Sequence, residues 1–226
     1  MDQGTRNDLT WIEMTAYIFL TAIIAMGFYY AVYDEEYFRN AFVPEDGILE
    51  TATAIMLFLA TIPLMIRFIR ERSIHPRSFS VFSILMVVVL VFVSGEEISW
   101  GQRIFDVETG EFFSKHNRQA ETNLHNLEVA GVNLNKLIFG KILVLFLVAF
   151  YLVLPWLYSR RGKVHGWVSG QYFPVPKIHH GISMLIFAVV IDFVPSSKRG
   201  ELNEVCLGVF ALLLVTSAQN IRQRKG

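Results

Sequence analysis

Long apolar runs limit what this chain can fold into more than any other feature of its sequence. A helix needs about 20 mostly apolar residues to cross the hydrocarbon core of a bilayer. Runs near that length cover residues 11–33, 47–68, 79–97, 137–158, 180–194 and 204–220. The last two runs are short, so they also fit a helical hairpin buried against the other helices. We predict an all-α fold, a polytopic membrane helical bundle of about six transmembrane helices.

The composition agrees with a membrane protein and argues against several other classes. Of the 226 residues, 53% are hydrophobic, and the zero net charge gives no sign of a nucleic-acid partner. The single cysteine, Cys206, excludes a disulfide within the chain and a cysteine-based metal cluster. No Walker loop, serine-hydrolase elbow, zinc-protease helix motif or dinucleotide fingerprint is present. We also expect the first run to be a retained span, because it is too long for the hydrophobic region of a signal peptide and lacks a strongly basic flank or a small-residue cleavage site.

Charged residues at the ends of the runs predict an orientation. Basic clusters follow the second, fourth and sixth runs, at residues 67–77, 160–163 and 222–225. With six spans all three clusters lie on one side, which the positive-inside rule assigns to the cytoplasm together with both termini. The long segment 98–136 then lies on the outer face. We expect a single transmembrane domain over residues 1–226, with residues 98–136 forming an outer-face lid of interfacial helices.

Acidic residues recur at the outer ends of the predicted spans. They are Glu50, Glu96, Glu97, Asp192, Glu201 and Glu204. A charge near the membrane is costly and calls for partners. If the spans pack as a bundle, these carboxylates form a ring at one depth, which makes the outer face the best candidate for a functional site.

The lid segment contains a second group of polar residues. We expect residues 98–105 to continue the third helix, and residues 115–129 to form a helix on the membrane surface. On that helix Asn117, Glu121 and His125 would share one stripe. The pair Glu121 and His125 could then grip a divalent metal such as zinc, with Glu97 or Glu50 completing the set. The competing interpretation is a hydrogen-bonded lid, in which Glu97 pairs with Arg103 and the amide side chains cap helix ends.

Two smaller features carry separate expectations. The adjacent His179 and His180 lie at the inner end of the fifth run, which favours an interfacial pair near the cytoplasmic headgroups. Ser94 and Gly95 are small residues that permit close approach of helices.

Three segments together resemble a family of bacterial integral membrane proteins of unknown function. They are Pro-Glu-Asp-Gly-Ile-Leu-Glu at 44–50, Gly-Glu-Glu-Ile-Ser-Trp-Gly-Gln-Arg at 95–103 and Asn-Arg-Gln-Ala-Glu-Thr-Asn-Leu-His-Asn at 117–126. The resemblance implies a multi-pass protein of the bacterial inner membrane. It implies no activity.

The leading functional hypothesis is a membrane-embedded enzyme that acts on a lipid or lipid-linked substrate at the outer leaflet. Glu97 would be the general base or a metal ligand, Glu121 and His125 ligands or acid–base partners, and Glu50 an orienting residue or ligand. Arg103 would hold an anionic headgroup, because its guanidinium fork suits phosphate. The remaining candidates for substrate binding are Trp100, Gln102, Asn117 and Asn126.

Two other classes stay open at this point. One is a small transporter, which needs a polar path across the whole bilayer. The other is a structural or assembly subunit whose polar lid docks a periplasmic partner. The sequence identifies neither the substrate nor the metal, and it leaves the oligomeric state undetermined.

Overall fold

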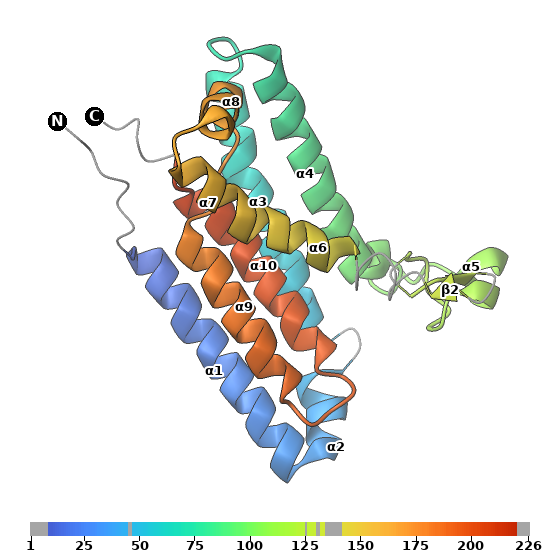
Figure 1. Ribbon diagram of the computed structural model, residues 1–226. Coiled ribbons are helices and arrows are strands. Elements are labelled where there is room, and N and C mark those ends of the chain that lie inside the picture. Colours follow the sequence, from blue (N-terminus) through green and yellow to red (C-terminus); the bar gives the residue numbers. More distant parts are fainter. Residues whose placement is uncertain (1–8, 45–46, 125, 130–131, 134–141, 221–226) are drawn as a thin grey trace.

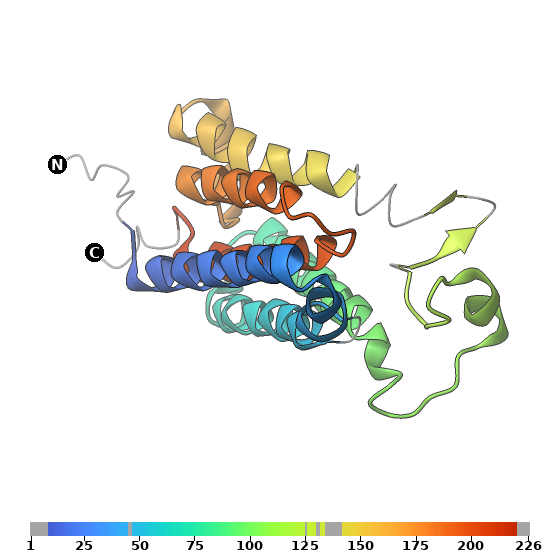
Figure 2. The same cartoon turned by 90° about the horizontal axis from the view of Figure 1, so that it is seen from below.

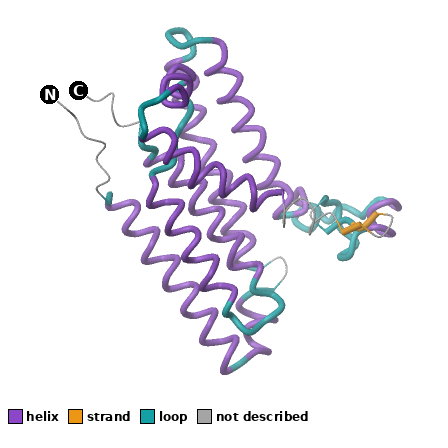
Figure 3. The backbone as a smooth tube through the Cα atoms, in the orientation of Figure 1, coloured by secondary structure: helices purple, strands orange, loops and turns teal. Residues whose placement is uncertain are grey.

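The computed structural model describes residues 9–44, 47–124, 126–129, 132–133 and 142–220. Within them the chain is mostly helical, and the only strands are two short ones in the lid, β1 (Glu128–Val129) and β2 (Val132–Asn133) (Figure 3). The predicted all-helical class is therefore confirmed.

Among the described residues, four helices are long and apolar enough to cross a membrane. They are α1 (Trp11–Tyr33), α3 (Ile48–Glu71), α4 (Arg77–Glu97) and α10 (Gly200–Ser217). A fifth candidate is a bent pair, in which the helical stretch α6 (Leu143–Val148), η4 (Ala149–Val153) and α7 (Leu154–Ser159) meets α8 (Lys163–Gln171) at 112°. The helix α9 (Ile178–Asp192) is shorter. These apolar helices are compatible with a membrane-embedded protein, and six spans remain a prediction.

The helix α10 forms the centre of the bundle, with α1, α3 and α9 packed against it (Figures 1 and 2). In the apolar part of α10, 56% of the residues are buried, compared with 11% in α4, so most of the α4 surface is exposed. The main core joins α10 residues such as Leu202 and Phe210 to Leu20 of α1 and Tyr151 of η4. The Tyr151 hydroxyl donates a hydrogen bond of 3.0 Å to the backbone oxygen of Phe210, which fixes η4 against α10.

The two ends of the bundle differ in character. The start of α1, the end of α10, helix α8 and the arginine-rich turn between α3 and α4 lie at one end, here called the basic end (Figure 1). The short elements α2 (Glu35–Tyr37) and η1 (Phe38–Phe42), the α9–α10 turn and the end of α4 lie at the other end, here called the lid end. The lid follows α4 and extends to one side of the helices (Figures 1 and 2).

Both helices predicted for the lid are absent. The helix α4 ends at Glu97, and the 3₁₀ turn η2 (Ser99–Gly101) follows, with Ser99 and Trp100 in the left-handed region at φ 46° and 56°. A helix cannot continue through such residues. The prediction of a helix over residues 98–105 was therefore wrong.

Asparagine side chains explain why residues 115–129 are also not one helix. The short helix α5 (Glu111–His116) ends where Asn117 forms a bridge with Leu127. The backbone N–H of Gln119 donates to Asn117 Oδ1 at 2.8 Å, and the N–H of Asn126 donates to Asn123 Oδ1 at 3.1 Å. Such local bonds compete with helical ones. The predicted stripe of Asn117, Glu121 and His125 on one helix face is consequently wrong.

Candidate functional site

A polar pocket lies at the lid end, between three helices and the lid. Its described lining residues are Glu50 of α3, Glu96 and Glu97 of α4, Glu204 of α10, and Ser99, Gln119, Glu121, Asn123 and Asn126 of the lid. We call it the acidic pocket. It is small and partly open to solvent.

The carboxylates in the acidic pocket are close enough to interact with one another. Glu97 is influenced electrostatically by Glu50, Glu96 and Glu201, and Glu204 by Glu97 and Glu50. The Glu201 side chain is hydrogen-bonded to that of Glu204. Among the described lining residues there is no lysine, arginine or histidine. The pocket therefore gathers carboxyl groups and other oxygen donors at one place.

Glu121 belongs to a buried network that covers this pocket. Its Oε2 accepts a hydrogen bond from the Ser99 hydroxyl and a second one, 3.1 Å long, from Asn123 Nδ2. Asn123 Nδ2 also donates to Ser99 Oγ at 2.8 Å. Ser99, Glu121 and Asn123 are all buried. The Glu121 carboxylate also pairs with Arg103, whose side chain is 51% exposed, so the expected pairing of Arg103 with Glu97 was wrong.

Glu96 connects the end of α4 to the lid. Its carboxylate accepts hydrogen bonds from Trp100 Nε1 at 2.8 Å and from the backbone N–H of Leu124 at 2.6 Å. The Trp100 ring lies against Gly95, where a methyl group would come within 2.8 Å of ring atom Cε3. Gly95 thus leaves space on α4 for the indole of Trp100. On the neighbouring position, the Ser94 hydroxyl donates a hydrogen bond of 2.8 Å to the Ala54 backbone oxygen of α3.

The other residues predicted to bind substrate are held by bonds within the lid. Gln102 bonds to Thr109 and accepts from the Thr122 N–H at 2.7 Å. Asn117 Nδ2 donates to the backbone oxygen of Asn123 at 2.9 Å, and Asn126 Nδ2 donates to Gln119. Of Trp100, Gln102, Asn117 and Asn126, only Asn126 lines the acidic pocket.

Of the predicted site residues, the structure brings Glu50, Glu97, Glu121 and Asn126 together around this pocket. His125 lies outside the described residues, so the proposed ligand set of Glu97, Glu121 and His125 remains a prediction. Asp192 was predicted to belong to the ring of carboxylates, but it is not among the described residues that line the pocket. Its side chain is 77% exposed and lies 3.4 Å from Arg199 Nε. Glu204 was expected in the ring of carboxylates but was given no catalytic or binding role, and Asn123 was not among the candidate site residues.

A second polar cluster, at the basic end, was missed almost entirely. It consists of Thr10, Glu13, Lys177, His179 and His180 and is called the Glu13 cluster below. Glu13 is fully buried, and its Oε1 lies 2.8 Å from Lys177 Nζ, 2.7 Å from His180 Nε2 and 3.3 Å from His179 Nε2. Its Oε2 accepts the Thr10 backbone N–H at 2.7 Å and completes a capping box. His180 is fully buried within the protein, and the expected position of the two histidines near the cytoplasmic headgroups remains a prediction.

The Glu13 cluster has the composition of a metal site but already contains a cation. The candidate ligand atoms of Glu13, His179 and His180 lie within 4.8 Å of one another. The Lys177 ammonium contacts both carboxylate oxygens of Glu13, at 2.8 and 3.0 Å. A divalent ion would have to compete with this ammonium, since a buried carboxylate is already neutralised by its partner. The arrangement is best explained as a link between the starts of α1 and α9.

The acidic pocket therefore remains the stronger candidate for chemistry, and the resemblance to a bacterial membrane family remains a prediction. Comparisons of this chain with protein-family models, with curated proteins and with solved structures gave no match.

Proposed function

We propose that this chain is a membrane-embedded enzyme that binds a divalent cation in the acidic pocket and acts on the headgroup of a lipid or lipid-linked substrate. The observation that carries the proposal is the convergence of Glu50, Glu97 and Glu204, from three different helices, beneath the amide side chains of the lid. Ordinary packing has no need for three carboxylates at one point, because buried like charges repel.

The donor set favours a hard cation. Magnesium, calcium and manganese ions prefer carboxylate, amide and hydroxyl oxygens, and all the described lining side chains offer such atoms. The ligands would be Glu50, Glu97 and Glu204. Glu121 would not be a ligand, because its carboxylate already binds Ser99, Asn123 and Arg103. When bound, such an ion polarises a phosphoryl or carbonyl oxygen. A zinc site on Glu97, Glu121 and His125 is the less favoured version, because Glu121 already has other partners.

The position of the pocket favours a lipid substrate. It lies where α4 ends and the lid begins, at the depth of a bilayer interface if the apolar helices span a membrane. Arg103 presents a half-exposed guanidinium beside Glu121, and a guanidinium suits a phosphate headgroup. Ile104 and Phe105 next to it are exposed by 71% and 74%, which suits contact with lipid.

The location that goes with this proposal is the bacterial inner membrane, with the lid on the outer side and both termini in the cytoplasm. Its support is the arginine-rich turn between α3 and α4, which lies at the end of the bundle opposite the lid.

Terbium luminescence tests the cation site directly. Tb³⁺ substitutes for calcium, and Trp100, whose Nε1 bonds to the lining residue Glu96, is placed to sensitise it. We expect saturable luminescence in the purified chain that is displaced by calcium or magnesium. Glu97→Gln and Glu204→Gln should each weaken binding at least tenfold, and Glu111→Gln, which alters an exposed ion pair on the lid, should not. Equal binding by all variants would overturn the proposal.

Activity needs its own test. Purified chain in mixed micelles with bacterial lipid extract should convert a lipid or lipid-linked component in a reaction that stops on chelation and on Glu97→Gln. Cation binding without any conversion would favour a non-catalytic role.

The second candidate is a structural or assembly subunit, and the lid network favours it. Gln102, Asn117 and Trp100 are bonded within the lid, as expected of a pre-formed docking surface. A periplasmic partner that co-purifies with the chain and is lost on Trp100→Ala would support it. A transporter has no comparable support, because the core of α10 between the acidic pocket and the Glu13 cluster is apolar.

A further inference from the structure

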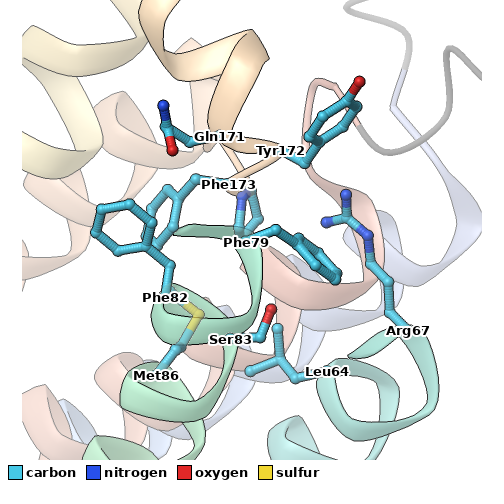
Figure 4. Close-up of a pocket in the computed structure, with 10 residues that line it drawn as sticks. Leu64, Arg67, Phe79, Phe82, Ser83, Met86, Gln171, Tyr172 and Phe173 are labelled. Carbon is cyan, nitrogen blue, oxygen red and sulfur yellow. The ribbon is translucent and has the colours of Figure 1, made fainter. Parts of the chain in front are cut away.

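A second pocket lies at the basic end, opposite the acidic pocket, between α3, α4 and the segment that follows α8. Figure 4 shows its walls: Leu64 and Arg67 of α3, Phe79, Phe82 and Met86 of α4, and Phe173 of the connecting segment, together with neighbouring residues. It is small and partly open to solvent. We call it the aromatic pocket. No site residue predicted from the sequence lies in it.

Arg67 is the one cation among the described lining residues. Its side chain is only 17% exposed, its guanidinium carbon lies 5.3 Å from the centre of the Phe79 ring, and its Nε donates to Glu71 at 3.1 Å. The two terminal nitrogens have no partner among the residues that the structure describes. Figure 4 places the guanidinium at the edge of the pocket, between Phe79 and Tyr172. It is therefore a largely buried donor group presented to the pocket.

The surroundings of Arg67 are positively charged. Arg70, Arg72 and Arg77 are exposed on the same turn of the bundle, and Glu71 is the acid among them. Basic pockets between transmembrane helices on the cytoplasmic side are typical sites for anionic lipid headgroups. The charge of this end of the bundle thus complements an anionic ligand.

Apart from Ser83 and Gln171, the remaining wall is apolar and aromatic. The Phe82 and Phe173 rings meet edge to face with centres 5.7 Å apart, and Met86 adds a flexible thioether beside them. A soluble anion gains nothing from such a wall. An acyl chain does, because apolar contact stabilises it.

The pocket wall is fixed by long-range contacts. The backbone oxygen of Phe173 accepts from Asn220 Nδ2 at 2.6 Å, and the Tyr172 ring stacks on His75 with centres 3.7 Å apart. These contacts tie the connecting segment to the end of α10 and to the α3–α4 turn. A pre-formed wall avoids part of the entropic cost of binding.

We propose that the aromatic pocket binds an anionic phospholipid, with its phosphate on Arg67 and one acyl chain along Phe82, Met86 and Phe173. The site is independent of the acidic pocket and of any activity there. It would hold a lipid of the cytoplasmic leaflet against the α3–α4 hairpin.

Native mass spectrometry of the full chain, released from detergent after titration with single lipids, tests the site. Phosphatidylglycerol and phosphatidylcholine with identical acyl chains are compared. We expect tighter binding of phosphatidylglycerol, weakened about fivefold or more by Arg67→Gln, which is the effect of one arginine near an anionic headgroup. The matched control is Arg72→Gln, which removes a neighbouring exposed arginine outside the pocket.

Ser83→Leu supplies a second variant that keeps every charge and narrows the pocket, since Ser83 lines it. It should weaken phosphatidylglycerol binding as well, which keeps the test valid if Arg67→Gln folds poorly. The proposal is overturned by equal affinity for the two lipids, by equal loss in Arg67→Gln and Arg72→Gln, or by unchanged binding in Ser83→Leu. Displacement of the lipid by millimolar inorganic phosphate would also overturn it, because it would identify a site for a soluble anion.

Discussion

Glu13 and His180 stand 167 positions apart in the sequence, yet Nε2 of His180 lies 2.7 Å from Glu13 Oε1, and both side chains are fully buried. Lys177 Nζ lies beside them, 2.8 Å from the same oxygen. The start of α1 is thereby fixed to the start of α9 by a neutralised charge cluster. Because charges removed from water are stable only while paired, this cluster should be sensitive to loss of a single member.

Glu13→Gln should therefore destabilise the chain strongly. It removes the carboxylate whose two oxygens the buried Lys177 ammonium contacts, and breaking a buried pair in this way costs about 3–5 kcal/mol. The measurement is thermal or denaturant unfolding of the purified chain in detergent. Glu35→Gln is the control, since Glu35 forms an exposed pair with Arg39, and its effect should stay below about 1 kcal/mol.

A double-mutant cycle with Lys177→Met separates the ion pair from simple packing. If the pair is the cause, the double variant will be less destabilised than the two single changes added together. Additive losses would contradict the assignment of Glu13 as the partner of Lys177.

Glu121→Gln should loosen the lid while leaving the bundle intact. The change removes the charge that meets Arg103 and alters the acceptor for Ser99 and Asn123, at a local cost of about 1–3 kcal/mol. Trypsin should then cut faster after Arg103, Lys115 and Arg118, with the melting temperature nearly unchanged. Glu111→Gln, on the exposed surface of the same segment, should leave cleavage at the wild-type rate. Unchanged cleavage of Glu121→Gln would argue against the buried network.

Gly95→Ala should displace Trp100 from α4. The added methyl group would lie 2.8 Å from the indole, so the ring must move and its bond to Glu96 must weaken. Fluorescence of a chain that keeps only Trp100, with Trp11, Trp156 and Trp167 replaced by Phe, reports the movement as a red shift and faster quenching. Gly110→Ala is the matched control, because a methyl group there meets no atom within 4 Å. Identical spectra for both variants would count against the packing of Trp100 on Gly95.

Apolar runs predicted the helices well, because helices with an exposed apolar surface and helices packed in the core both consist of long apolar runs. The run at 11–33 coincides with α1, and the run at 79–97 ends where α4 ends. The convergence of Glu50, Glu97 and Glu204 was also predictable, since each occupies the outer end of an apolar run and packing brings equal depths together. Asp192 is the exception, because the depth of a residue in the bundle does not determine the direction in which its side chain points.

The lid and the Glu13 cluster could not be predicted in the same way. Helical periodicity in residues 115–129 was overridden by side-chain bonds from Asn117 and Asn123 to nearby backbone, which a pattern of spacing does not reveal. Glu13 is a lone acid inside an apolar run, and its partners on α9 and just before it, Lys177, His179 and His180, lie at least 164 positions away. Threonine at position 10 and glutamate at position 13 have the spacing of a capping box. That spacing predicts the start of a helix but not a contact with α9.

Gly181→Ala should destabilise the bundle more than any other glycine-to-alanine change in the described helices. Gly181 of α9 lies directly against η4, where a methyl group would overlap the Tyr151 backbone oxygen and come within 2.7 Å of Leu152 Cδ2. The backbone oxygen cannot rotate away as a side chain can, so α9 and η4 must separate, at a cost of at least about 1–3 kcal/mol. That separation would also disturb the Tyr151 hydroxyl bond to α10. The check is the unfolding free energy compared with Gly170→Ala, where a methyl group on α8 meets no atom within 4 Å and the helix gains propensity. Equal stability of the two variants would show that α9 and η4 are not packed this closely.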